Sequence, residues 1–400
     1  MNRLIFKFRI VVCLVSVAFF TGDAVGAEVE IIDVSKPAQI VIIGSDPFIT
    51  DMQDSCTPAH LRSALAAVRP DIIAVDATEQ IVRSGQYYGT DIKWVVVPWA
   101  EERNIPVVPI GVEIEDYNQQ VEDMLTQIRK DGLVKEYKFV EDNLYSAQKA
   151  MKKTFKAFNS AELESIWRRY HRDMQRIYKR RTPWQQWNQK IADNLVELGN
   201  KNPGKRIAVV IGAAHCYYLK DAVLDVDGLT LLSIENSLDF NAATLKENFR
   251  AIDYVRSLRP LMFDNFGRLS ESVLTELETR LQRLRQYPEY KNDMDFFRGK
   301  MLLHRGKSVQ AVRQLVPLTY LDSKTLLEYD KTTPVRDAAM IYIAVAKIEQ
   351  GDIPKGKNDL LQISQMADVK PETRDWAVRI IQQMQPYRSP EVTVDLSKVK

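Results

Sequence analysis

The chain has 400 residues, of which 45% are hydrophobic and 27% charged. This composition predicts two or three folded domains and excludes a disordered chain. The net charge of +2 becomes zero when the leader described next is removed, so nucleic acid is not an expected partner.

Residues 1–27 have the features of a secretory signal peptide. Arg3, Lys7 and Arg9 precede the apolar run 10–20, and the small residues 25–27 offer a cleavage site. The run is shorter than the roughly 20 apolar residues that cross a bilayer. We therefore expect an exported protein, periplasmic or secreted, with no transmembrane span in the mature chain. The alternative is an uncleaved membrane anchor.

Residues 28–240 show the alternation of strands and helices that predicts a parallel sheet. Thr57 and Pro58 form a helix start, and that helix is expected to run to Val68 before Pro70 interrupts the pattern. Because strands and helices alternate, the predicted fold class is an α/β domain. Its strands are expected at 39–44, at 72–75, at 107–110, in RIAVVIG and in GLTLLSIE.

A charged helical segment, about 117–198, interrupts this α/β domain. Asn159 and Glu162 have the spacing of a capping box before the helix that begins LESIW. The segment is predicted to be a helical insertion between two strands of the sheet.

Residues 241–386 are expected to form an all-α domain of helical pairs. When 295–319 is aligned with 337–364, Gly306 coincides with Gly351 and Leu315 with Leu360, as does Phe297 with Tyr342. The small-residue turn between apolar helices resembles tetratricopeptide (TPR) repeats, although the offset of 45 residues is longer. We therefore expect this domain either to pack against the sheet domain or to present a groove to a protein partner. Residues 387–400 are expected to be a flexible tail.

Polar side chains follow several predicted strands. Asp46, Asp76 and Glu113 follow the first three, and His215 follows the fourth after Gly212. Because the carboxyl ends of parallel strands share one edge of a sheet, these side chains are expected to meet in a crevice there. His215, Asp46 and Asp76 would suit a divalent ion such as zinc or manganese. The alternative is that His215 is a helix-start histidine bonded to a nearby carbonyl.

The stretch Gly212–His215 at a strand end, preceded by the helix WNQKIADNL, resembles the GxxH motif of the TraB/GumN/TIKI and ChaN-like superfamily. The resemblance covers about residues 39–235. It implies an α/β sheet with inserted helices, and metal-dependent hydrolysis of peptide or ester bonds in some members and haem binding in others.

Several positions depart from the family pattern. Gly44 matches the glycine of the first motif, but Pro47 stands in place of its histidine. Asp76 is in the position of the usual glutamate. Asn188 matches the asparagine of an Arg-Asn pair, whereas Trp187 replaces the arginine. Arg180 and Arg181 either substitute for that arginine or form a solvated basic face.

Two cysteines, Cys56 and Cys216, remain after Cys13 leaves with the leader. In an oxidising compartment a disulfide between them is expected. Two free thiols, or one thiol at a metal, are the alternatives. His60, His171 and His304 have no other candidate ligand or catalytic residue at a characteristic spacing, so they are predicted to be structural or surface residues.

Aromatic residues gather in GQYYGTDIKWVVVPW and RTPWQQW, where they line a ligand pocket or pack in the core. The sequence has no glycine-rich phosphate loop, serine elbow or HExxH motif. We therefore predict a hydrolase with an altered site, in which His215 with Asp76 activates water and Asn188 orients the substrate. The alternative is a non-catalytic scaffold that binds a small molecule or peptide in the crevice, or a protein.

Overall fold

The computed structural model describes residues 36–46, 56–87, 89–113, 116–151, 154–235, 238–262, 269–329 and 331–383. The predicted leader, Pro47 and the predicted tail lie outside these residues.

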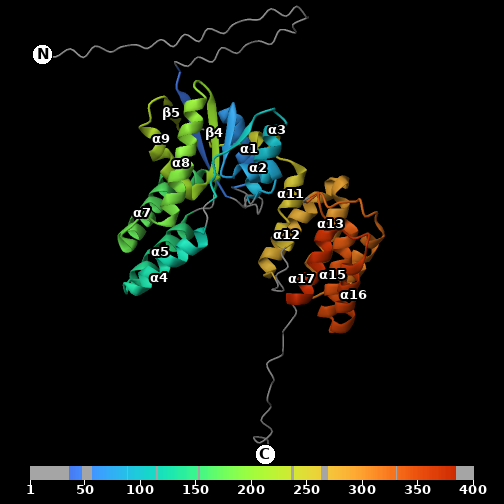
Figure 1. Ribbon diagram of the computed structural model, residues 1–400. Coiled ribbons are helices and arrows are strands. Elements are labelled where there is room, and N and C mark those ends of the chain that lie inside the picture. Colours follow the sequence, from blue (N-terminus) through green and yellow to red (C-terminus); the bar gives the residue numbers. More distant parts are fainter. Residues whose placement is uncertain are drawn as a thin grey trace, which may run out of the picture.

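A five-stranded, fully parallel sheet forms the centre of the first half of the chain (Figure 1). The strand order is β3-β2-β4-β1-β5. The inner strands are almost entirely apolar because helices cover both faces. The predicted fold class is therefore confirmed. The strands are β1 (Ala38–Ser45), β2 (Ile72–Val75), β3 (Val107–Pro109), β4 (Arg206–Gly212) and β5 (Leu229–Leu232).

The two faces of the sheet have separate hydrophobic layers. Val41 and Ile43 pack against α1 (Pro58–Val68), the π-helix η2 (Ile92–Val96) and α3 (Val97–Glu101). Ile40 and Ile42 pack on the other face, against α8 (Pro183–Lys201) and α9 (Cys216–Leu224). The short helix α2 (Glu79–Ser84) follows β2, and the 3₁₀ turn η3 (Ala213–His215) joins β4 to α9.

The predicted helical insertion lies between β3 and β4, and its helices α4, α5 and α7 extend away from the sheet (Figure 1). Met124, Ile128 and Met174 form its small core. The helices before α8 are α4 (Tyr117–Lys130), α5 (Val134–Ala150), α6 (Phe155–Phe158) and α7 (Ala161–Tyr178).

Asn159 connects this insertion to the sheet. Its Oδ1 accepts a hydrogen bond from the Gly44 N–H at 2.6 Å, and its Nδ2 donates to the Gly44 carbonyl at 3.0 Å. β5 pairs with β1 only as far as Val41, so the Asn159 amide continues the ladder where β5 has ended. The predicted capping role of Asn159 is wrong, because Ser160 is the N-cap of α7.

Glycine is required at position 44 because the helical insertion approaches β1 closely there. A Cβ at Gly44 would lie 2.6 Å from the Phe158 carbonyl oxygen and 3.1 Å from the Cys216 sulfur. A side chain would therefore push the insertion away from the sheet.

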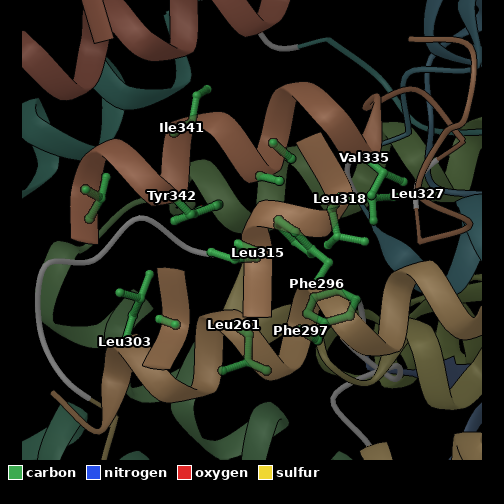
Figure 2. Close-up of a cluster of buried hydrophobic side chains, with 14 of the residues drawn as sticks. Leu261, Phe296, Phe297, Leu303, Leu315, Leu318, Leu327, Val335, Ile341 and Tyr342 are labelled. Atoms are coloured by element: carbon green, nitrogen blue, oxygen red, sulfur yellow. The ribbon is translucent and has the colours of Figure 1, made fainter. Parts of the chain in front are cut away.

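The second half of the chain is helical and has its own core (Figure 1). Figure 2 shows part of this cluster, with Phe296, Leu315 and Tyr342 among the labelled side chains. The only extended pairing among the described residues after β5 is an isolated bridge between Leu326 and Pro334. The helices are α10 (Ala242–Glu247), α11 (Ala251–Arg256), α12 (Glu271–Arg283), α13 (Lys291–His304), α14 (Ser308–Leu315), α15 (Val335–Glu349), α16 (Ile353–Gln365) and α17 (Pro371–Gln383).

The two helical pairs α13–α14 and α15–α16 are equivalent at the turn. Gly306 and Gly351 both have positive φ, 69° and 91°, which favours glycine after a helix. The aligned residues Phe297, Tyr342, Leu315 and Leu360 are all buried. The internal repeat in the sequence thus corresponds to similar turns and packing in the two pairs.

A buried ion pair joins the two halves of the chain. Both terminal guanidinium nitrogens of Arg62, in α1, donate to the Asp253 carboxylate in α11 at 2.7 Å, and both side chains are almost fully buried. Beside it, Trp94 of η2 contacts Tyr329 edge to face and belongs to the helical core. In this aromatic stretch, Trp94 and Trp99 are therefore core residues.

None of the helices in the described part of the chain combines the length and apolar character that a membrane crossing requires.

We expect Arg62→Met to lower the free energy of unfolding by about 3–5 kcal/mol, because it leaves the Asp253 carboxylate buried without its counter-ion. The double variant Arg62→Met with Asp253→Met should recover most of that loss. Urea denaturation measures the free energy of unfolding of the single and the double variant. As a control, Arg83→Met breaks the exposed pair with Glu79 and should cost less than about 1 kcal/mol. Equal losses at the two sites would contradict this account.

Candidate functional site

A cavity of about 420 Å³ lies where β1 and β4 end. The register pairs Ser45 with Gly212, so the polar residues after the two strands are brought side by side. Helices of the insertion form the other walls. The lining residues are Ser45, Asp46, Gln148, Met151, Ala157, Phe158, Leu163, Trp167, Trp184 and 212–215. We call this cavity the strand-end pocket.

The structure places Asp46 and His215 together in this pocket, but Asp76 is not one of its lining residues. β4 lies between β1 and β2, so the residues after β1 and β2 are held apart. Asp76 instead lies beside Gly111, where an added Cβ would come within 2.7 Å of its Oδ1. Glu113 is exposed.

Within the described ranges, no group of three or more histidine, cysteine, aspartate or glutamate side chains could hold a metal ion. The predicted ligand set of His215, Asp46 and Asp76 is therefore not assembled.

His215 is fixed by contacts on several sides. Its Nδ1 lies 2.6 Å from Asn188 Oδ1, and its ring stacks on Trp184 with centroids 4.2 Å apart. Trp187 contacts it edge-on. Because an amide oxygen only accepts, Nδ1 carries the proton and Nε2 keeps its lone pair. Burial lowers the pKa of His215 to about 4, so the ring is neutral near pH 7.

Asn188 therefore holds the His215 ring in place, and its predicted role in orienting a substrate stays a prediction. Asn188 is fully buried. Its Nδ2 and the indole nitrogens of Trp184 and Trp187 are buried with no hydrogen-bond partner. Trp187 packs edge to face on Tyr117, with ring centroids 5.2 Å apart. The proposed stand-ins, Arg180 and Arg181, are both exposed.

His215 lies at one end of a column of stacked rings. Trp184 stacks on His171 with centroids 5.4 Å apart and planes within 7°, and His171 stacks on Tyr217 at 5.8 Å. Burial, with a smaller effect of His215, lowers the pKa of His171 to about 3. The sequence analysis predicted a structural or surface role for His171, and the residue is buried within this column. Its i, i+4 spacing from Trp167, which also stacks on it, is the signal that could have identified it.

Asp91 is a second residue that sequence reasoning missed. It is 3% exposed and accepts hydrogen bonds from the Ile92 N–H at 2.8 Å and from the Ser45 side chain. Burial is the main reason that its pKa is raised to about 6, and the nearby charge of Asp46 adds to this effect. Asp91 therefore supports the end of β1 through its hydrogen bond with Ser45.

The predicted disulfide is wrong, because Cys56 and Cys216 are both free and buried. Cys56 belongs to the layer with Val41 and Ile43, and Cys216 to the layer with Ile40 and Ile42. Successive residues of a strand point to opposite faces, so the sheet separates the two cysteines. Burial raises the pKa of each thiol to about 12, which keeps both protonated.

Comparison of this chain with known family models, curated proteins and solved structures found no match.

The neutral state of His215 predicts a pH-dependent contribution to stability. Its pKa is about 4 in the folded chain against 6.5 in water. Between these two pKa values the folded state therefore binds fewer protons than the unfolded state. The contribution of neutral His215 to the free energy of unfolding is full above pH 6.5 and is lost as the pH falls towards 4. His215→Asn removes the titration, while the new amide nitrogen can still donate to Asn188.

We expect the stability advantage of the native chain over His215→Asn to shrink by on the order of 2 kcal/mol between about pH 7 and pH 5. Urea denaturation at the two pH values measures the difference, in which groups common to both chains cancel. An advantage that does not change with pH would contradict a buried neutral His215.

Proposed function

We propose that this protein binds a small, mostly apolar molecule with a planar ring in the strand-end pocket. The observation that carries the proposal is the pocket itself, whose volume of about 420 Å³ falls within the range of small-molecule sites. Trp167, Trp184 and Phe158 supply aromatic surface, and Ala213 and Ala214 leave space between them.

The arrangement of His215 supports binding of a ligand with a hydrogen-bond donor. Because Nδ1 is bonded to Asn188, the acceptor nitrogen Nε2 is at the other side of the ring. A ring buried on Trp184 loses little conformational freedom on binding. His215 therefore orients the ligand, while the apolar walls of the pocket bind it.

Two broader predictions accompany this proposal. We infer export from the leader-like residues 1–27, and we infer a protein partner for the helical region 241–386 from its likeness to TPR repeats. Binding in the strand-end pocket depends on neither of them.

Nile red, a neutral apolar dye whose fluorescence rises in apolar surroundings, provides a direct test. We expect saturable binding that Ala214→Phe weakens by about tenfold or more, since the new ring fills the pocket. The matched control is Ala222→Phe in α9, which borders a separate open groove. Equal binding by both variants would place the dye elsewhere and overturn the proposal.

Hydrolysis is the second candidate function, and the orientation of His215 favours it. A neutral imidazole with a free Nε2 lone pair can take a proton from water, and the Asn188 bond keeps the ring in place. The motif Gly212–His215 and its likeness to the TraB/GumN/TIKI and ChaN-like superfamily also support this candidate. The described residues do not bring the three predicted metal ligands together, so this candidate is general-base catalysis by His215.

Hydrolysis of nitrophenyl acetate, with metal content measured on the same samples, separates the two candidates. For a binding protein we expect the native chain and His215→Ala to hydrolyse the ester equally slowly and to carry the same amount of metal. A loss of about a hundredfold in rate in His215→Ala would instead establish general-base catalysis. A loss of bound metal in His215→Ala would instead support the metal-dependent hydrolase predicted from the sequence.

A further inference from the structure

The glycine at position 212 leaves one edge of the His215 ring uncovered. Both residues line the strand-end pocket. A Cβ added at Gly212 would lie 3.3 Å from His215 Cδ2 and 3.8 Å from Nε2, so even a methyl group would crowd this edge. Within the described ranges no group forms a hydrogen bond with Nε2, whereas Nδ1 is bonded to Asn188. The Nε2 lone pair is therefore available to a molecule in the pocket.

This lone pair discriminates between the polar groups that a ligand could carry. Because His215 is neutral and its Nδ1 holds the proton, Nε2 can accept a hydrogen bond but cannot donate one. A carbonyl, ether or carboxylate oxygen also only accepts, so it would face the lone pair without a hydrogen bond. Two buried acceptors with no donor between them are unfavourable. The pocket therefore favours a ligand whose polar group donates.

Other lining groups narrow the class of this donor. Trp184 contributes ring surface, since its indole nitrogen is buried. Gln148 of α5 also lines the pocket, and its side-chain amide can donate a hydrogen bond as well as accept one. A hydroxyl group suits both His215 and Gln148, because it donates its proton to Nε2 and keeps lone pairs that can accept from the amide. The N–H group of a pyrrole-type ring offers only the first of these two bonds.

We propose that the ligand of the strand-end pocket is a phenol, a neutral aromatic ring that carries a hydroxyl group. The hydroxyl donates to His215 Nε2, and the ring packs against the aromatic and apolar walls. A phenol is also a stronger hydrogen-bond donor than an aliphatic alcohol. This inference rests on the proposed ligand-binding function and specifies the class of its ligand.

Two isomers of equal size and a hydrocarbon of similar shape test the inference. The hydroxyl of para-ethylphenol donates, the ether oxygen of para-methylanisole only accepts, and para-xylene has no polar group. All three are uncharged near neutral pH, so the difference between the isomers reports the hydrogen bond and not the net charge around the pocket. Isothermal titration calorimetry on the full chain gives each affinity. We expect para-ethylphenol to bind about tenfold more tightly than para-methylanisole.

His215→Phe should remove this preference. The new ring can still stack on Trp184, but it has no nitrogen that accepts a hydrogen bond. We therefore expect para-ethylphenol to bind to the variant about tenfold more weakly than to the native chain, and para-xylene to bind as before. His304→Phe in α13 is the matched control, because His304 does not line the pocket. It should leave all three affinities at their native values.

Gly212→Ala provides a second test if His215→Phe no longer binds para-xylene. Gly212 has φ −54° and ψ 134°, which alanine also adopts, and the added methyl group would lie beside Nε2. We expect this variant to weaken the binding of para-ethylphenol by a larger factor than that of para-xylene. Equal weakening of the two would overturn the phenol inference.

The outcomes with the native chain and His215→Phe separate the two proposals. Equal binding of the two isomers to the native chain, or tighter binding of the ether, would overturn the phenol inference and leave pocket binding in place. A preference for para-ethylphenol that persists in His215→Phe would assign the hydroxyl to another acceptor and would also overturn the inference. If none of the three probes binds, and Nile red does not bind either, the proposed function itself fails.

Discussion

The pairing of β1 with β4 is the constraint on which the rest of this structure depends. The two strands run in register from Gln39 and Arg206 to Ser45 and Gly212 at the centre of the sheet. Both then turn into polar residues at the same point, so Asp46 and His215 face one cavity although they are far apart in the sequence. The helical insertion completes the cavity, since Asn159 holds it against the last residues of β1.

The sequence predicted which edge of the sheet carries the polar residues, but not how far apart they are along it. Adjacent strands are about 4.8 Å apart, so residues after β1 and β2, with β4 between them, are separated by roughly twice that distance. Asp76 is therefore on the predicted edge yet outside the pocket. Strand order depends on long-range pairing that no local pattern in a single sequence reveals.

Local sequence patterns predicted the helices and strands well, but they predicted the contacts between distant residues poorly. Thr57 and Pro58 begin α1 as predicted, and β2 has its predicted limits at Ile72 and Val75. In contrast, Asn159 was predicted to cap a helix, and it pairs with Gly44 of β1 instead. Roles of this kind depend on which distant groups lack a partner after folding, and that information appears only in three dimensions.

The buried pair of Arg62 and Asp253 has a consequence for how the protein is made. The two residues are 191 positions apart, so at roughly 5–20 residues per second the ribosome adds the aspartate about 10–40 s after the arginine. During that interval α1 can pack on the nascent sheet only by burying a cation alone, which is strongly unfavourable. The α/β half therefore reaches its final packing only after translation has passed α11, although most of its strands emerge earlier.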